Sequence, residues 1–326
     1  MWGGKNIAVI GGGVAGLTAA RLLREHGASV QVFEKARGPG GRLSTRRRDG
    51  RQFDHGAQYF TARSQPFEAV VRRWADDEVV AQWRGQLGQW KPDGIADSDA
   101  ATRWVGAPRM SALTRYLSKD LEVVTATRIV AMERGSDGWT IEEEDGSCRG
   151  PFDVVILTCP GPQAAALAPP QSAVHRRASS LQYTPCWAAM ITVSEDREGL
   201  LDGYQCAHPV AAWVANDSSK PGRPVSGRWV VHAQAAWSAE HEEASPDDVA
   251  DALSAAFTEV VGLPIESVQV HRWRYALAER TPGPSMVFEE AIGLALCGDA
   301  LAGGKVESAW QSAVDLVTYM TGTRDE

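Results

Sequence analysis

The stretch from Ile7 to Thr45 constrains the fold of this chain more than any other part of its sequence. A short apolar run, Ile7 to Ile10, predicts a buried strand, and the sequence Gly11-Gly12-Gly13-Val14-Ala15-Gly16 follows it directly. An apolar helical pattern comes next, and a second predicted strand, Ser29 to Phe33, ends at Glu34. Strand, glycine-rich turn, helix and strand in this order predict a dinucleotide-binding βαβ unit.

Each position of this motif has a physical reason. Gly11 permits the tight turn, Gly13 lets a pyrophosphate approach the backbone, and Gly16 lets the helix pack closely on the sheet. The start of the helix offers unpaired N–H groups and the positive end of its dipole to phosphates. Glu34 lies where a carboxylate accepts the protons of both ribose hydroxyls and disfavours a 2′-phosphate, so we expect a ligand of the plain ADP type.

A second glycine-rich turn, Gly40-Gly41-Arg42, follows and is itself followed by Thr45. Together with Glu34, this arrangement resembles the flavoprotein group that includes amine oxidases, phytoene desaturases and protoporphyrinogen oxidases. In that group the turn passes beside the FAD pyrophosphate, and the arginine reaches a phosphate or the flavin edge. The resemblance therefore implies FAD as the cofactor; the alternative is a surface turn with an exposed arginine.

The end of the chain carries a matching motif. A strand predicted at Gly293 to Cys297 leads into Gly298-Asp299, and Gly303 to Trp310 opens a final predicted helix. By the same resemblance, Asp299 binds a ribityl hydroxyl or the pyrophosphate, and the helix N-terminus stabilises negative charge on the reduced flavin. The resemblance also makes Ile129 the neighbour of the adenine. The expected cofactor contacts are Gly11, Gly13, Val14, Ala15, Gly16, Glu34, Lys35, Gly41, Arg42, His55, Gly56, Ala57, Ile129, Asp299, Lys305, Val306 and Glu307.

Composition limits the other possibilities. A chain of 326 residues with 44% hydrophobic and 23% charged residues is typical of a soluble globular enzyme of two domains, or of one large domain with an insertion. A formal net charge of -8 argues against a general nucleic-acid binder. The local run Arg46-Arg47-Arg48 beside Asp49 indicates either a solvated turn or an attractor for an anionic ligand.

The cysteines indicate a reducing environment. There are five, an odd number, and no zinc-type spacing occurs, so we expect free thiols and no metal site. Cys297 lies within a predicted strand, so FAD is expected to be held non-covalently. No signal peptide precedes the first strand and no apolar run is long enough to span a bilayer, which leads us to expect a cytoplasmic protein.

The rest of the chain alternates strands, helices and loops. We expect a loop at 91–102, a hairpin turn at 136–138, and a break at 159–162 where the chain crosses between domains. Helices are expected at 64–77 and 246–261, and strands at 79–90, 122–125, 128–134, 138–143, 152–158, 186–193, 211–215 and 229–235.

The segment Phe53-Asp54-His55-Gly56-Ala57-Gln58-Tyr59-Phe60 has two interpretations. Gly56 and Ala57 are small enough for backbone to lie against a flavin ring, and Gln58, Tyr59 and Phe60 would then face the molecule that stacks on it. Alternatively the segment is a core strand with a buried histidine, which periodicity alone favours.

Taken along its whole length, the chain resembles the bacterial renalases. The matching pieces are Phe53 to Phe60, Trp104 to Gly106, Trp229 to Ala233, Trp237-Ser238, His271 to Ala276 and the closing stretch Gly298 to Trp310. The resemblance implies an α/β fold of the p-hydroxybenzoate hydroxylase and amine oxidase type, with a Rossmann-type FAD-binding domain and a mixed-sheet α+β substrate domain. We expect the first domain to comprise residues 1–62, 103–165 and 270–326, and the second 63–102 and 166–269.

The same resemblance implies an activity in metabolite repair. Renalases oxidise the 2-dihydro and 6-dihydro isomers of NAD(P)H to NAD(P)+: hydride passes to flavin N5, and O2 is reduced to hydrogen peroxide. Because a dihydropyridine already donates hydride, no residue is expected to act as a general base; the protein must stack and orient the ring. Candidate substrate contacts are Gln58, Tyr59, Phe60, Trp90, Trp187, His232, Trp237, Trp273 and Arg274, although each aromatic residue taken singly is more typical of a core.

Two other functions remain open from the sequence. An amine oxidase would be reduced by amines, whereas a non-catalytic FAD-bearing binding protein would be reduced by neither amines nor dihydropyridines. No lysine can be placed beside the flavin from the sequence, and the oligomeric state is undetermined.

Overall fold

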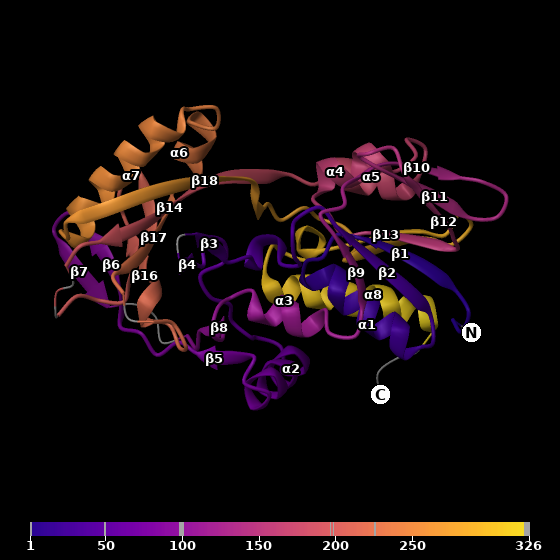
Figure 1. Cartoon of the computed structure of the whole chain (residues 1–326), viewed down its shortest axis with the longest axis horizontal. Coiled ribbons are helices and arrows are strands. Elements are labelled where there is room, and N and C mark those ends of the chain that lie inside the picture. Colours follow the sequence, from indigo (N-terminus) through magenta and orange to yellow (C-terminus); the bar gives the residue numbers. More distant parts are fainter. Residues whose placement is uncertain are drawn as a thin grey trace.

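The computed structural model describes residues 2–48, 50–97, 101–195, 197, 199–224 and 226–322. Two sheets lie at opposite ends of the longest axis (Figure 1). The first sheet has the order β19-β20-β13-β1-β2-β9, and its neighbouring strands are parallel except for the antiparallel pair of β19 and β20. Its strands are β1 (Asn6–Ile10), β2 (Ser29–Glu34), β9 (Glu122–Thr125), β13 (Val154–Leu157), β19 (Met286–Glu289) and β20 (Leu294–Cys297). This arrangement confirms the predicted Rossmann-type fold.

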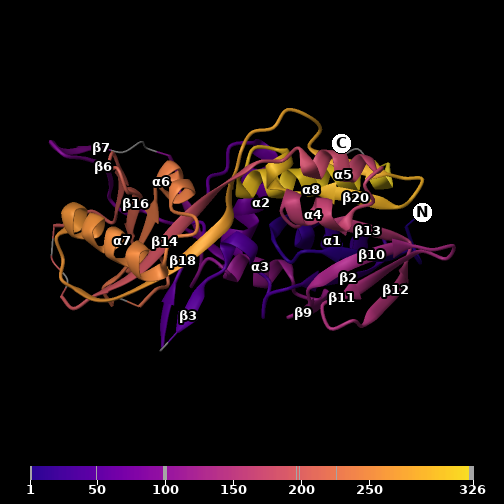
Figure 2. The same cartoon turned by 90° about the horizontal axis from the view of Figure 1, so that it is seen from above.

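Both faces of the first sheet are covered (Figure 2). Ile7 and Val9 enter one hydrophobic core and Ala8 and Ile10 enter another, which explains why β1 is apolar at nearly every position. The first core contains the helices α1 (Val14–Glu25), α3 (Ala112–Leu117) and α8 (Val306–Thr321). The second contains α4 (Gly161–Leu167), α5 (Ala173–Ser179) and a three-stranded sheet of β10 (Ile129–Arg134), β11 (Trp139–Glu143) and β12 (Cys148–Phe152).

The second sheet has the order β18-β14-β17-β16-β15-β6-β7. Its strands are β6 (Leu87–Lys91), β7 (Gly94–Asp97), β14 (Tyr183–Val193), β15 (Gly203–Cys206), β16 (Ala211–Asn216), β17 (Arg228–Ala233) and β18 (Ile265–Ala278). All neighbours are antiparallel except β15 and β6, so the sheet is mixed, as predicted. The helices α6 (Ala235–Glu240) and α7 (Pro246–Val261) lie on one of its faces (Figure 1).

Short elements occupy the region between the two sheets. They are the helix α2 (Gln65–Asp76), the paired strands β5 (Val80–Gln82) and β8 (Trp104–Gly106), and the hairpin of β3 (Arg46–Arg48) and β4 (Arg51–Phe53). Phe53 at the end of β4 packs on Met190 and Val230, so the hairpin contacts the second sheet. The face of that sheet opposite α7 is therefore turned toward the first sheet.

The structure corrects several expectations. The loop expected at 91–102 contains strand β7, while residues 98–100 lie outside the described residues. The expected break at 159–162 instead begins α4, and α5, placed by the sequence in the second domain, packs on β19 and β20 of the first sheet. Strand β18 runs across the expected boundary at 270. The domain ranges themselves stay a prediction.

Other expectations are confirmed. α2 and α7 match the helices expected at 64–77 and 246–261, and the Ser245 hydroxyl accepts a hydrogen bond from Asp248 N at the start of α7. Within the described part of the chain, no helix is long and apolar enough to cross a membrane.

Candidate functional site

The first glycine-rich turn is shaped both by packing and by empty space. A Cβ on Gly16 would lie 2.1 Å from the Gly11 carbonyl oxygen, and Gly11 has a φ of +121° beside Thr158. At Gly13, by contrast, no described atom other than those of the residue itself and its two chain neighbours lies within 4 Å of the position that a Cβ would take. The chain therefore has no internal reason for glycine at 13, whereas a pyrophosphate that approached this backbone would require it.

Glu34 is oriented by backbone groups on both sides. Its side chain is buried, Oε2 accepts a hydrogen bond from Gly12 N at 2.8 Å, and Oε1 accepts one from Ala36 N at 2.8 Å. Each oxygen keeps lone-pair capacity for a further donor, as a ribose diol would require. Thr127 N donates to the Glu34 carbonyl, which places the segment leading to buried Ile129 beside this carboxylate.

The second glycine-rich turn contacts the first. Gly40 N donates to the Gly12 carbonyl at 3.0 Å, and a Cβ on Gly41 would lie 3.6 Å from Gly13 Cα. Arg42 forms an ion pair with Asp299 and donates to the Ala276 carbonyl at 3.2 Å. Burial lowers the pKa of Arg42, but the charge of Asp299 outweighs it, so the pKa is raised and the guanidinium stays charged.

A pocket opens beside this ion pair. It lies at the carboxyl ends of β13 and β20, where α/β sheets of this type bind ligands, and its lining includes Thr158, Tyr183 and Gly298. Apart from Gly298 itself and its two chain neighbours, no described atom lies within 4 Å of the position that a Cβ on Gly298 would take. Two glycines with open space, a buried carboxylate and a charged arginine thus converge on one edge of the sheet, and these residues fit a dinucleotide cofactor.

The remaining predicted cofactor contacts take varied positions. Lys35 and Lys305 are exposed; Lys35 reaches Gln163 at 3.4 Å, and Lys305 precedes α8. Val306 packs against the first core. The Glu307 carboxylate accepts hydrogen bonds from Arg63 N and Ser64 N at 3.0 and 2.8 Å, so it anchors the start of α2, and its contact with the cofactor stays a prediction.

The second sheet presents a ring-rich surface to these turns, which we call the imidazole wall: His55, His232, His271 and Trp273. Trp273 Nε1 donates to the His55 carbonyl at 3.0 Å, and His232 Nε2 lies 3.1 Å from the same oxygen. The His55 ring lies 4.9 Å from the ring of His271 and 4.9 Å from that of Trp273, centroid to centroid. Strands β17 and β18 and the segment after β4 therefore meet around His55.

The histidines of this wall are uncharged at neutral pH. Burial lowers the pKa of His55 to about 3, with further contributions from His271 and Arg46. Burial also lowers the pKa of His232 to about 4 and that of His271 to about 4. His55 Nδ1 is buried and has no hydrogen-bond partner among the described residues, a condition that costs about 1–3 kcal/mol unless water or a ligand satisfies it.

Gly56 and Ala57 join the wall to the cofactor turns. Ala57 N donates to the Arg42 carbonyl at 2.9 Å, and a Cβ on Gly56 would lie 2.1 Å from that oxygen. Close packing against Arg42 thus explains the glycine by itself. Gln58 is engaged within the protein: Nε2 donates to the carbonyls of Asp54 and Gly56, and Oε1 accepts from Lys220 at 3.1 Å. These contacts make Gln58 an internal support, and its contact with substrate stays a prediction.

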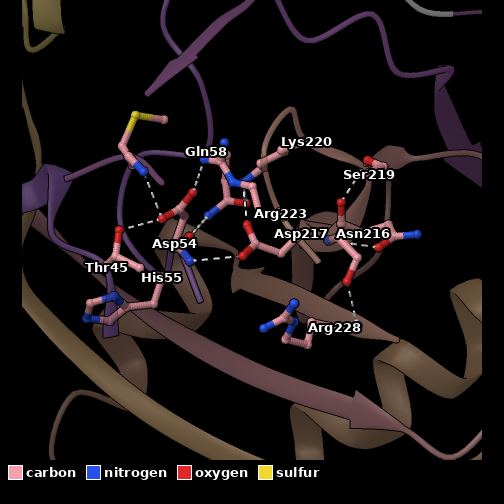
Figure 3. Close-up of polar contacts among 12 residues, drawn as sticks. Thr45, Asp54, His55, Gln58, Asn216, Asp217, Ser219, Lys220, Arg223 and Arg228 are labelled. Carbon is pink, nitrogen blue, oxygen red and sulfur yellow. Dashed lines mark hydrogen bonds and ion pairs between the residues drawn. The ribbon is translucent and has the colours of Figure 1, made fainter. Parts of the chain in front are cut away.

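Gln58 belongs to a buried polar cluster that the sequence did not indicate (Figure 3). Asp54 pairs with Arg223 and also accepts hydrogen bonds from Thr45 and Met110 N, while Lys220 Nζ lies 2.7 Å from Asp217 Oδ1. All four charged side chains are at most 1% exposed. Burial raises the pKa of Asp217, whereas Lys220 and Arg223 outweigh burial at Asp54 and lower its pKa.

This cluster holds the backbone that carries the wall. Asp54 N donates to Asp217 Oδ2 at 3.2 Å, which ties the segment after β4 to the loop after β16. In Figure 3 the His55 ring points away from these charges. The ion pairs therefore fix the position of residues 54–58 without themselves forming the wall.

The other predicted substrate contacts are spread over the two faces of the second sheet and the core of the first sheet. Tyr59 packs on Trp213 (5.6 Å) and Trp83 (6.4 Å), near the segment that bears His55. Trp90 and Trp187 lie in the core beneath α7 instead, and Phe60 lies in a core of the first sheet.

Trp237 and Arg274 also lie away from the imidazole wall. Trp237 stacks on His241 at 4.2 Å, and Arg274 pairs with Glu242 and Glu243. Trp90, Trp187, Phe60, Trp237 and Arg274 therefore have the contacts of packing or surface residues, while sequence reasoning missed His271 and Trp213 on the opposite face.

Comparison with known families agrees with this geometry. A model described as an NAD(P)-binding Rossmann-like domain matches residues 9–74, and a model of the flavin containing amine oxidoreductases matches residues 85–319. The chain belongs to the flavin containing amine oxidoreductase family. The family implies a flavin cofactor and an oxidoreductase activity.

Relatives match mainly in part. Over 76 residues the chain is 43% identical to the zeta-carotene-forming phytoene desaturase of Myxococcus xanthus, covering 22% of this chain and 15% of that protein. Over 57 residues it is 47% identical to the mitochondrial protoporphyrinogen oxidase of Nicotiana tabacum, covering 18% of this chain and 11% of that protein. The chain thus aligns with far less than two thirds of the length of these relatives.

Solved structures match over the whole chain at low identity. A putative protoporphyrinogen oxidase from Exiguobacterium sp. 255-15 has a TM-score of 0.78 at 15% identity, covering 98% of this chain and 99% of that one. A CLA-producing fatty acid isomerase from P. acnes has a TM-score of 0.74 at 12% identity, covering 97% and 98%. A putrescine oxidase bound to putrescine has a TM-score of 0.72 at 14% identity, covering 98% and 99%. These likenesses establish a shared fold.

Proposed function

We propose that this protein is an FAD-dependent oxidase that converts the 2-dihydro and 6-dihydro isomers of NAD(P)H to NAD(P)+. The reaction is dihydro-NAD(P) + O2 + H+ → NAD(P)+ + H2O2: a hydride leaves the ring, and its two electrons reach O2, which takes up two protons. The proposal rests on membership of the flavin oxidoreductase family together with the sequence resemblance to bacterial renalases.

The proposed cofactor contacts are those that converge at the sheet edge. Glu34 would accept the ribose hydroxyl protons, the turn at Gly13 would receive the pyrophosphate, and Arg42 with Asp299 would hold the phosphate or ribityl part. When bound there, FAD supplies a two-electron acceptor for hydride and a means of passing electrons to O2. No covalent attachment is proposed.

The imidazole wall is the structural observation that supports this substrate assignment. His55, His232 and His271 are held neutral by burial, and Trp273 adds a large aromatic surface. Such a wall can stack a flat, neutral dihydropyridine and orient its carboxamide by hydrogen bonds. His55 Nδ1, buried without a partner among the described residues, is one nitrogen that the carboxamide would satisfy.

The charge state of the wall favours a dihydropyridine over an amine. Hydride loss from a dihydropyridine requires no proton transfer from carbon or nitrogen, so neutral rings suffice. An alkylamine is mostly protonated at pH 7, and neutral imidazoles offer no charge to hold it. Asp54 and Asp217, which support the backbone of the wall, are buried and already ion-paired.

Product analysis tests this proposal. The purified flavoprotein is supplied in air with 2-dihydro-NAD, 6-dihydro-NAD, ordinary 4-dihydro NADH or a panel of alkyl and aryl amines. We expect NAD+ and H2O2 to form in a 1:1 ratio from the 2- or 6-isomer, and little peroxide from NADH. Peroxide released with aldehyde and ammonia from an amine would instead establish an amine oxidase and overturn the proposal.

A further inference from the structure

A groove lies at the edge strand β18, which also carries His271 and Trp273 of the imidazole wall, and its lining is partly charged and partly apolar. Its arginine side consists of Arg37, Arg46 and Arg47, and its apolar side consists of Met190 from β14 and of Val268 and Val270 from β18, the last two packed against the core beneath α7. The first turn of α7 contributes Pro246 and Asp247. The groove has a volume of about 520 Å³, which is within the usual size of ligand pockets.

The three arginines of the groove have no ion-pair partner within the described part of the chain. This is unexpected in a chain with a net charge of -8, where acidic partners are abundant. Arg109 lies near these arginines. Burial, the charge of Arg115 and the charge of Arg47 all lower the pKa of Arg109, so the positive charge extends beyond the groove. Unpaired like charges held close together destabilise a fold unless an anion neutralises them.

One residue of the groove, Arg46, lies near the imidazole wall. Arg46 pairs in the hairpin with Phe53, two residues before His55. Its charge also contributes to the lowered pKa of both His55 and His271, which places the guanidinium near these rings. A ligand whose ring stacks on the wall would therefore extend its other end along the arginines.

We propose that this groove is the binding site for the pyrophosphate and adenosine half of the substrate dinucleotide, with Arg46 and Arg47 bound to its phosphates and the apolar side against its adenine. The assignment rests on the proposed function for the identity of the substrate. Arginine is suited to phosphate because its planar fork donates two parallel hydrogen bonds. Asp247 repels an anion, so the phosphates bind on the arginine side of the groove.

This site is distinct from that of FAD. The FAD contacts proposed above lie on the first sheet and its turns, whereas the apolar side of the groove is formed by strands of the second sheet. Substitutions in the groove should therefore leave flavin content unchanged. The ratio of flavin absorbance to protein absorbance in the purified variants measures this content directly.

Two kinds of measurement on the FAD-loaded protein test the groove. Calorimetric titration with ADP and with inorganic pyrophosphate measures binding without turnover. Steady-state assays compare KM for 6-dihydro-NAD with KM for dihydronicotinamide riboside, which has no phosphate. The variants are Arg46→Gln and Arg47→Gln, and the control is Arg134→Gln, an exposed arginine on β10 that loses the same charge.

We expect Arg46→Gln and Arg47→Gln each to weaken ADP and pyrophosphate binding and to raise KM for the dinucleotide by roughly tenfold, the effect of one charged hydrogen bond. KM for the riboside should stay within about twofold, as should all values for Arg134→Gln. If the wild type binds neither ADP nor pyrophosphate, or if the variants raise KM for the riboside as much as KM for the dinucleotide, the groove assignment is wrong. Neither result would contradict the proposed oxidase function. If ADP binding depends on the arginines but no dihydropyridine is oxidised, the groove is supported and the proposed function fails.

Discussion

Replacing Lys220 by methionine should destabilise the protein strongly, because the lysine is the direct partner of a buried carboxylate. Its side chain is 0% exposed, that of Asp217 is 1% exposed, and Nζ lies 2.7 Å from Oδ1. At an effective dielectric constant of about 20, two unit charges at this separation attract by about 6 kcal/mol. Desolvation offsets much of that attraction in the wild type, but the variant keeps the desolvated Asp217 without its nearest cation.

We expect Lys220→Met to lower the free energy of unfolding by about 3–5 kcal/mol at pH 8. The loss should shrink as the pH falls. Removal of Lys220 takes away the charge that opposes the raised pKa of Asp217, so the folded variant binds a proton at a pH where the unfolded chain does not. Stability relative to wild type then rises as the pH falls through that raised pKa.

Urea unfolding at pH 8 and pH 5.5, at equal FAD concentration, measures these differences. Two further variants serve as controls. Arg72→Met removes a cation from the exposed pair with Glu68 and should cost less than about 1 kcal/mol. Lys220→Met combined with Asp217→Asn removes both charges and should recover a large part of the loss. If Lys220→Met were no worse than Arg72→Met, or if the double variant recovered nothing, the account of this cluster would be refuted.

Further predictions follow from single positions. Glu34→Ala should reduce FAD affinity by roughly 10- to 100-fold through loss of a charged acceptor, measured as the flavin-to-protein absorbance ratio after gel filtration; full flavin occupancy would count against this site. Gly13→Ala should bind less flavin but keep the melting temperature of the FAD-free wild type, whereas Gly16→Ala should fail to fold, both measured by circular dichroism. If the two variants were equally destabilised, the interpretation of the empty space at Gly13 would be contradicted. Because the pKa of His271 is lowered to about 4 in the folded state, the free energy of unfolding should fall as the pH drops from about 6.5 to 4. His271→Phe should reduce the slope of that free energy against pH by up to the amount that corresponds to one bound proton; an unchanged slope would contradict the burial argument. Arg274→Gln should leave KM and kcat within about twofold, because its guanidinium pairs with surface carboxylates; a large rise in KM would return Arg274 to the substrate site.

The first sheet and its turns were predictable because their signals are local. The strand, the three glycines and Glu34 lie within about thirty residues, and each residue type has one physical use in that order. Helix α7 was equally clear, since a serine cap, a proline at its start and an apolar period all agree. The short strand β7 was missed because polar residues and a proline surround it.

The substrate contacts were harder to predict, because the alternation of residues along a strand defines two faces of the sheet but does not show which face is turned toward the first sheet. In β18, alternate residues share a face, so Trp273 and Arg274 point to opposite sides of the sheet. Only the position of α7 reveals which face is turned to the first sheet, and it places Trp187 in the covered core. Trp273 and Arg274 were both proposed from the sequence, although only one of them lies on the wall.

The buried charges were unpredictable for a different reason. Asp54 and Arg223 are separated by 169 positions, and no local pattern in the sequence indicates that they pair. Their partnership depends on the second sheet bringing the loop after β16 against the segment after β4. Isolated charged residues in a sequence are normally taken as surface residues, and these become buried only because each finds a partner.

Anaerobic reduction of the flavin tests the central claim most directly. The FAD-loaded protein is mixed with purified 2-dihydro-NAD or 6-dihydro-NAD in a stopped-flow instrument, and absorbance at the visible flavin maximum is followed. Parallel mixtures contain 4-dihydro NADH and the amines. We predict rapid bleaching by one or both isomers, saturating with concentration, with slow or no bleaching by NADH and amines. Bleaching by an amine alone, or by none of these compounds, would contradict the account.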